Sequence, residues 1–327
     1  MAAAADSAAV SIPQTERDIY VGEVPVRLDP ATLKRLSQLR PLVSTAHIAL
    51  EWSLMLAAAF ACWRFWHPAL YVLAVMFIGA RQHALIVLAH EAAHWRLFRR
   101  RALNDWVGEL FLAWPFVLFT MQAYRRNHLP HHRYINTEQD PDWVRKQNPE
   151  WRFPMTRWQL ARLLILDVLG VGFAKFVIVA VRLPRNPASE GKQGKAFKLG
   201  QLMFLGVTAT VLSVWHLWVP YLLFWVVPYI TWMQLCFHVR SIAEHFAIRG
   251  RTGIYAQTRT VLPTWLERVL VLPKNANYHL EHHMFPSVPF YRLPELHRQL
   301  MSQPSFRESA HITHGYLGVL RECTQPQ

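Results

Sequence analysis

Cysteine is scarce in this chain, and its scarcity excludes several kinds of site. Only Cys62, Cys236 and Cys323 occur among 327 residues, and they are too few and too scattered for a disulfide framework or a thiolate metal site. We expect no signal peptide, because the first 40 residues have neither a basic start nor an early apolar stretch. We therefore expect residues 1–42 to form a cytosolic, partly flexible N-terminal tail.

Acidic residues are few as well. The 21 Asp and Glu residues against 35 Lys and Arg residues leave a net charge of +14 and a pI near 10.1. Such a balance can indicate a nucleic-acid partner. Here, however, the basic residues cluster beside apolar segments, as the positive-inside rule predicts for cytosolic loops. We therefore expect a membrane and no nucleic acid as the partner.

Long apolar runs are what the chain has in abundance. Runs of about 20 residues match the ~30 Å hydrocarbon layer of a bilayer, so we predict an all-α integral membrane protein with four transmembrane helices. The four spans are expected at about 43–63, 68–89, 199–218 and 219–237. A single membrane and cap domain would cover 43–295, with 296–327 as a cytosolic C-terminal tail. The basic run Arg99–Arg101 after the second span indicates its cytosolic side.

Two further apolar stretches are ambiguous. Residues 103–119 are short for a span and are expected to be interfacial or re-entrant. Residues 158–183 are long enough to cross but carry Arg162, Asp167 and Lys175. Histidine clusters on both sides of this stretch can share metals only on one side of the bilayer, which requires an even number of spans between them. We therefore expect 158–183 to lie in the membrane interface.

Eight of the 17 histidines fall into three tight patterns. The first pattern is His-x-x-x-His, which places both rings on one face of a helix. The other two are His-x-x-His-His, which offers two or three rings to a metal pair from a single turn. The members of the three patterns are His90, His94, His128, His131, His132, His279, His282 and His283. Eight imidazoles are too many for one ion, because a zinc site uses three or four protein ligands. Two metals are the natural number.

Ligand type alone does not select the metal, because imidazole suits zinc, copper, iron and nickel. The sharpest alternative is a zinc membrane protease, since His90-Glu-Ala-Ala-His94 matches H-E-x-x-H. In that case Glu91 would be the general base on a zinc-bound water. The alternative leaves both His-x-x-His-His patterns unexplained.

The three patterns resemble the histidine boxes of the membrane fatty acid desaturase family. The likeness covers roughly residues 40–295 and includes Asn127-His-Leu-Pro-His-His-Arg-Tyr with the later Asp140-Pro-Asp142, and Asn277-Tyr-His-Leu-Glu-His-His-Met-Phe-Pro286. The resemblance implies four transmembrane helices with a cytosolic helical cap, which carries a histidine-rich site for two iron ions. It also implies O2 as cosubstrate.

The resemblance implies a ninth ligand on the helix that leaves the last span. His245 stands at the matching place, with His238 as the fallback. Some relatives carry an asparagine one turn earlier that contacts metal through water, whereas this chain has Ser241. Side chains that could orient the ligand rings are Ser241, Asn277, Asp140, Asp142 and Glu281. The remaining histidines are expected to be structural or solvated: His47, His67, His83, His216, His297, His311 and His314.

The function implied by the resemblance is O2-dependent desaturation of a lipid or fatty acyl chain. Lipid hydroxylation and carotenoid ketolation are possible on the same scaffold, and a non-catalytic metal-dependent membrane receptor is a further alternative. No haem domain, flavin fingerprint or Cys-rich cluster is present in the sequence, so we expect an external electron donor of the ferredoxin or cytochrome type. We expect a multi-pass protein of a bacterial inner membrane, rather than of the endoplasmic reticulum, with its metal site on the cytosolic side.

One ion pair is predicted inside the bilayer. Glu51 in the first span and Arg81 in the second lie roughly 12–14 Å from the cytosolic ends of these spans, at 1.5 Å per residue. A lone charge at that depth costs roughly 2.5–3.5 kcal/mol. Opposite charges at one depth should therefore pair.

Overall fold

Four long helices dominate the computed structural model, which describes residues 24–117, 120–182 and 192–325. Those long and apolar enough to span a membrane are Pro41–Arg64 (α3), Pro68–Ala93 (α4), Gly194–Val214 within α10 (Lys192–Val214), and the interrupted stretch Trp218–His245. The all-α membrane architecture with four candidate spans is thus confirmed. The last stretch continues to His245, beyond the predicted end at 237, and so delivers that histidine to the cap.

The fourth candidate span consists of four consecutive helical segments. It comprises α11 (Trp218–Tyr221), the π-helical turn Leu222–Val226, α12 (Val227–Ile230) and α13 (Trp232–His245). Pro228 lies in α12, and the hydroxyl of Thr231 donates to the carbonyl of Val227 at 2.6 Å. Gly79 of α4 faces this break so closely that an added Cβ would lie 2.9 Å from the backbone nitrogen of Met233. Glycine there lets α4 and α13 approach.

The two ambiguous stretches do not form continuous long helices. The described part of 158–183 divides into α8 (Arg157–Val168) and α9 (Val171–Arg182), which are separated at Gly170 with φ +80°. Neither helix has the length that a span needs. The other stretch forms α5 (Arg101–Val107), a π-helix (Gly108–Ala113) and a 3₁₀ turn (Trp114–Phe116), and lies at 101° to α6 (Met121–Tyr134). This bend fits either a re-entrant loop or a broken span.

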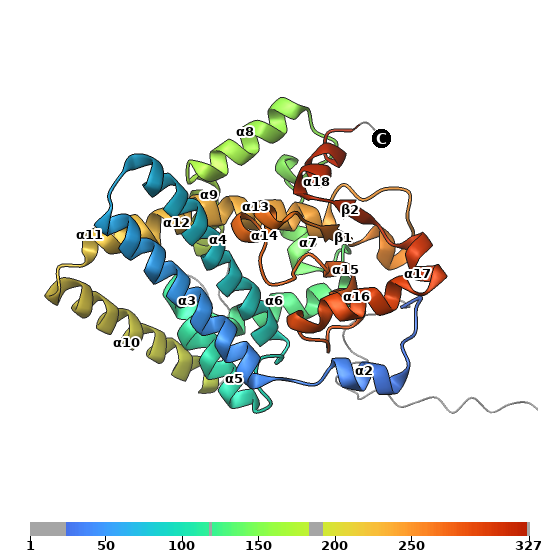
Figure 1. The fold of residues 1–327 in the computed structure, drawn as a ribbon, viewed down its shortest axis with the longest axis horizontal. Helices are drawn as coiled ribbons and strands as arrows, with labels where there is room; N and C mark the ends of the chain where they lie inside the picture. Colours follow the sequence, from blue (N-terminus) through green and yellow to red (C-terminus); the bar gives the residue numbers. More distant parts are fainter. Residues whose placement is uncertain (1–23, 118–119, 183–191, 326–327) are drawn as a thin grey trace, which may run out of the picture.

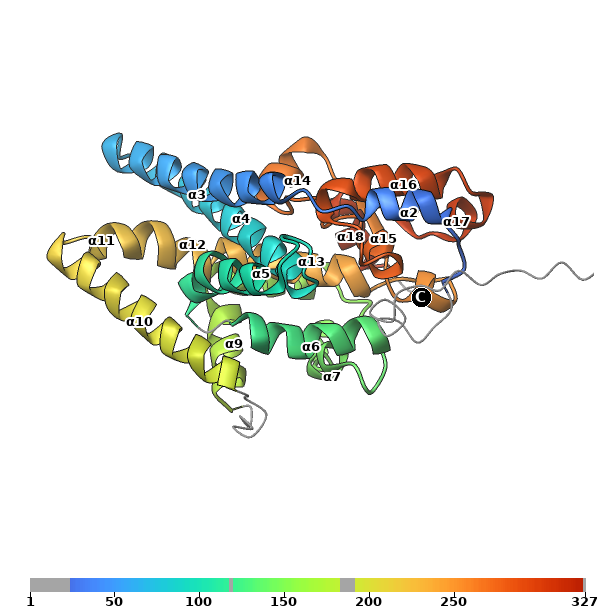
Figure 2. The same ribbon diagram turned by 90° about the horizontal axis from the view of Figure 1, so that it is seen from below.

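Short elements form a cap at the opposite end of the molecule from the α10–α11 turn (Figures 1 and 2). The elements between α6 and α8 are α7 (Pro141–Arg145) and the 3₁₀ turn Pro149–Trp151. Those after α13 are the 3₁₀ turn Gly253–Ala256, β1 (Thr260–Leu262), α14 (Trp265–Leu270), α15 (His279–Met284), the 3₁₀ turn Phe290–Arg292, α16 (Leu293–Met301), α17 (Pro304–Ser309), β2 (Ile312–His314) and α18 (Tyr316–Glu322). β1 and β2 pair in parallel with Thr260 opposite Ile312.

The described parts of both segments expected to be tails, residues 24–42 and 296–325, contain folded, buried structure, and residues 1–23 lie outside the described residues. In the N-terminal segment, α2 (Pro30–Leu36) buries Leu36 completely, and Ser37 hydrogen-bonds Ser287 at 2.8 Å. In the C-terminal segment, Phe306 and Val319 are fully buried. In both segments the apolar residues are spaced singly along short helices, without the long run that indicates a span.

The ion pair predicted inside the bilayer is confirmed. The guanidinium Nη1 of Arg81 lies 3.3 Å from Oε2 of Glu51, and both side chains are almost completely buried. The pair joins α4 to α3 along their shared face. A third charge joins it from the cap, because Nζ of Lys274 lies 2.5 Å from Oε1 of the same glutamate.

Candidate metal centre

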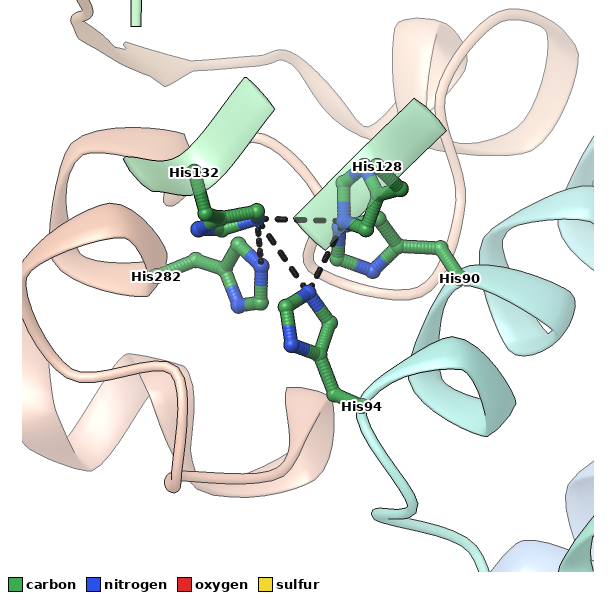
Figure 3. Close-up of side chains that lie close together, drawn as sticks. All are labelled: His90, His94, His128, His132 and His282. Carbon is green, nitrogen blue, oxygen red and sulfur yellow. Dashed lines mark hydrogen bonds between the residues drawn. The ribbon is translucent and has the colours of Figure 1, made fainter. Parts of the chain in front are cut away.

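The nine histidines proposed from the sequence come together in two buried groups. In each group the ring nitrogens that could bind an ion lie within 4.8 Å of one another. The first group has five histidines: His90, His94, His128, His132 and His282. The second has four: His131, His245, His279 and His283. Figure 3 shows the rings of the first group pointing toward one another from α4 and its C-terminal end, α6 and α15.

The helical spacing of the histidines within the second and third boxes explains how their rings are divided between the two groups. In α6, His128 and His132 are one turn apart and point to the five-histidine group, whereas His131 points to the other group. α15 divides in the same way, because His282 joins the first group and the other two box histidines join the second. The two groups adjoin, since the rings of His132 and His283 stack with centroids 4.0 Å apart.

The nitrogen spacing fits that of ligands around one ion. Two nitrogens that bind an ion at about 2.1 Å and at right angles are about 3.0 Å apart. In the first group, Nε2 of His94 lies 2.8 Å from that of His128 and 3.2 Å from that of His132. In the second, Nε2 of His279 lies 3.0 Å from those of His245 and His283. The residues present therefore fit two metal ions.

The protonation state also suits metal binding. Burial, followed by repulsion from neighbouring imidazoles, holds the pKa of His282 and of His283 well below the usual value for histidine. Such rings are neutral at physiological pH. A neutral ring offers a lone pair, which is the form that coordinates a metal.

In the four-histidine group, oxygen atoms contact the Nδ1 atoms of His131, His245 and His279. Asp140, the fully buried residue before α7, accepts a hydrogen bond from Nδ1 of His131 at 2.8 Å. The carbonyl oxygen of Gln257 lies 3.1 Å from Nδ1 of His245. These contacts fix which nitrogen of each ring faces the centre and make that nitrogen a better donor. Asp140 was among the residues proposed from the sequence for this role.

Glu244 and Glu91 make similar contacts that the sequence analysis did not assign. Oε1 of Glu244 lies 3.2 Å from Nδ1 of His279, and the same carboxylate accepts from Arg240 at 2.5 Å. Oε1 of Glu91 lies 3.4 Å from Nδ1 of His90. Both glutamates directly adjoin a proposed ligand in the sequence, but only Glu91 also belongs to a recognisable motif, H-E-x-x-H.

Several other candidates contact different partners. Asp142 pairs with Lys146 at 2.5 Å, and Lys146 also donates to Ser241 at 3.2 Å. The amide of Asn277 donates to the carbonyl of Val261 in β1 at 2.8 Å.

Glu281 accepts hydrogen bonds from Thr260 and from His297, a histidine that was expected to be structural. Asn277 and Glu281 thus brace the third box against β1 and α16.

His238, the fallback ligand, lies outside both groups. Its Nδ1 is 2.7 Å from Oδ2 of Asp167 in α8, and its ring packs on Trp151 with centroids 4.5 Å apart. The structure therefore brings His245, and not His238, to the centre. That His245 binds a metal stays a proposal.

Known proteins resemble this chain over most of its length. The profile of the family described as "Fatty acid desaturase" matches residues 66–314. A dihydrorhizobitoxine desaturase of Bradyrhizobium elkanii is 30% identical over 295 residues, which are 85% of this chain and 81% of that protein. An sn-1 oleoyl-lipid 12-desaturase of Arthrospira platensis is 23% identical, with coverage of 77% and 72%. A beta-carotene ketolase of Paracoccus is 26% identical, with coverage of 76% and 89%.

Proposed function

Because the chain belongs to the fatty acid desaturase family, we propose that it is a membrane-bound, O2-dependent desaturase of a lipid acyl chain with a histidine-ligated di-iron centre. The observation that carries the proposal is the pair of adjoining buried groups of five and four imidazoles. The chemistry that two irons supply when bound is the O2-dependent removal of two hydrogens from a saturated carbon pair, with water as the other product.

The residues of the chain hold and shield this centre. α4, α6, α13 and α15 provide the rings, and the carboxylates of Asp140 and Glu244 fix the orientation of His131 and His279. All nine rings are buried, so water is largely excluded from the place where the substrate is oxidised. Exclusion of water protects reactive intermediates from side reactions.

Electrons for the reaction come from an external donor in this proposal. The segment that follows the second box carries the exposed cations Arg133, Arg145 and Arg152. An acidic ferredoxin or cytochrome-type protein is complementary to such a surface. Added salt should therefore slow the donor-dependent rate.

We place the centre on the cytosolic side of a bacterial inner membrane. The exposed basic run Arg99–Arg101 lies between the first two boxes and supports this orientation. A cysteine introduced at the exposed Arg145 should react with an impermeant thiol reagent only from the cytosolic side. One introduced at the exposed His67 should react only from the opposite side, and the reverse labelling pattern would contradict the orientation.

A hydroxylase or ketolase is the second candidate, and it is favoured by the similarity to a beta-carotene ketolase. The relative from Bradyrhizobium elkanii is named for dihydrorhizobitoxine, so non-lipid metabolites belong among the substrates to be tested. The zinc protease alternative is not supported by the contacts of Glu91. Its Oε2 accepts from the backbone nitrogen of Phe290 at 2.9 Å and its Oε1 lies beside His90, whereas a protease needs this carboxylate at a metal-bound water.

Mass spectrometry of whole-cell lipids and non-lipid metabolites tests the proposal. Cells that express the chain should accumulate a compound with two fewer hydrogens than its precursor, only in the presence of O2. The matched His282→Ala variant should not produce it and should bind less iron. A product with added oxygen would identify a hydroxylase or ketolase. Purified protein containing one zinc per chain, with peptidase activity that Glu91→Gln abolishes, would overturn the proposal.

A further inference from the structure

The segment between β1 and the third histidine box leaves the cap and reaches the membrane helices. It contains the six-residue helix α14, which packs beside α4 (Figure 1). The carbonyl of Val269 accepts from Nη2 of Arg81 in α4 at 2.6 Å, and that of Leu270 accepts from the indole nitrogen of Trp232 at 2.7 Å. Both donors belong to candidate spans.

The positions of Arg81 and Trp232 along their helices show how far the C-terminal end of α14 lies from the metal centre. Arg81 lies nine residues before His90, which corresponds to about 13 Å along the axis of α4. Trp232 lies farther still from His245, the end of its own span. The C-terminal end of α14 therefore lies well below the level of the metal centre, at a height where α4 crosses the hydrocarbon layer.

Backbone groups at both ends of α14 form hydrogen bonds with side chains, which a nonpolar environment favours. At the N-terminal end of α14, Thr264 and Glu267 form a reciprocal capping box, with the carboxylate accepting from the nitrogen of Thr264 at 2.8 Å. At the C-terminal end, the carbonyls of Val269, Leu270 and Val271 each lie within hydrogen-bond distance of a side chain. The carbonyl of Val271 lies 3.1 Å from Nδ1 of His83. An unpaired backbone group in lipid costs several kcal/mol. Each of these contacts removes that cost for one backbone group of the segment.

The outer surface of α14 is apolar. Trp265 is 75% exposed and Leu266 is 49% exposed, and both lie in its first turn. Tryptophan is enriched where a protein meets the boundary between lipid headgroups and acyl chains. We propose that α14 is embedded in the leaflet next to the metal centre, where Trp265 and Leu266 contact lipid, as a membrane element that does not span the bilayer.

A second contact fixes this element in place. After α14 the chain turns through Lys274 and Asn275, both with positive φ, and Nζ of Lys274 lies 2.8 Å from Nδ1 of His47 in α3 and 2.5 Å from Glu51. The third box begins at His279, a few residues later. The membrane element thus ties the position of the third box to the depth of the bilayer.

Nitroxide accessibility in lipid nanodiscs tests the proposal on the full-length chain. A spin label at Leu266→Cys is compared with labels at Leu56→Cys, which is exposed on the spanning helix α3, and at Gln299→Cys, which is exposed on cap helix α16. The native cysteines are buried, so the unmodified chain gives the labelling background. Collision with O2 is favoured in acyl chains, and collision with a water-soluble nickel chelate is favoured in water.

The label at Leu266→Cys should show the high ratio of O2 to nickel collisions that Leu56→Cys shows. A ratio equal to that of Gln299→Cys would overturn the proposal. Should Leu266→Cys fail to fold, the unmodified chain can be reconstituted with a phospholipid that carries a photoreactive group on its acyl chain. Label should then appear on the peptide that contains Trp265 and Leu266. Label confined to the four spans would equally overturn the proposal.

Discussion

The contact between Asp140 and His131 offers a sharp test of how the four-histidine group is organised. One carboxylate oxygen of Asp140 caps α7 by accepting from the nitrogen of Asp142 at 2.8 Å, and the other accepts from Nδ1 of His131 and from the nitrogen of Asn136. In Asp140→Asn the capping oxygen can stay. The other position becomes an amide nitrogen, which cannot accept from the ring and would face two donors.

Loss of such a carboxylate behind a ligand histidine typically lowers metal affinity by about 10- to 100-fold. This change corresponds to about 1.4–2.7 kcal/mol. Asp140 is fully buried, so we expect the upper half of this range. The purified variant should release iron at a chelator concentration at least tenfold lower than the unmodified chain, with metal content measured after desalting.

The control is Asp142→Asn, which removes a neighbouring charge that pairs with Lys146. Its iron release should stay close to that of the unmodified chain. Asp140→Ala should be destabilised further, by about 0.5–2 kcal/mol, because it also removes the helix cap. Equal iron release by Asp140→Asn and the unmodified chain would refute the reasoning, as would a similar loss in Asp142→Asn.

Three further predictions concern the ligands, the buried charges and the metals. His245→Ala should abolish turnover and lower the iron content, whereas His238→Ala should retain iron; the opposite pattern in metal analysis would show that the assignment is wrong. Glu51→Gln should lower the melting temperature in detergent more than Arg81→Gln, because it leaves both Arg81 and Lys274 without their carboxylate. Removing one partner of a buried pair costs about 3–5 kcal/mol. If the losses of stability in the two single variants add strictly in the double variant, Glu51 and Arg81 are not coupled. Removal of metal with a chelator should lower the melting temperature, and added Fe²⁺ should restore it; an unchanged transition would argue against two bound ions.

The sequence predicted the spans and the histidine set because both depend on local patterns. A long apolar run is visible without knowledge of its neighbours, and the spacing of His90 and His94 places two rings on one face of any helix. Within each box the residues lie about one helical turn apart, so local geometry brings their rings together. The meeting of different boxes, such as His132 with His282 across 150 residues, was implied only by the resemblance to the desaturase family.

Contacts between distant segments could not be predicted in this way. Lys274 reaches Glu51 across 223 residues of sequence, and nothing near either residue indicates the other. The parallel pairing of β1 with β2 is another example, because three-residue strands carry almost no periodic signal. Glu244 directly precedes His245 in the sequence, whereas the fold turns it toward His279.

The second and third boxes each contribute histidines to both groups, and this division couples the positions of the two groups. Consecutive residues on a helix point about 100° apart, so His131 and His132 must face different directions even though they are adjacent. α6 therefore lies between the two groups and contributes to both, and α15 does the same. A rotation of either helix would move rings of both groups together. Two metals held in this way cannot be positioned independently, so a substitution that reorients α6 or α15 should affect both sites at once, whereas a change behind His90 or His245 can alter one site alone.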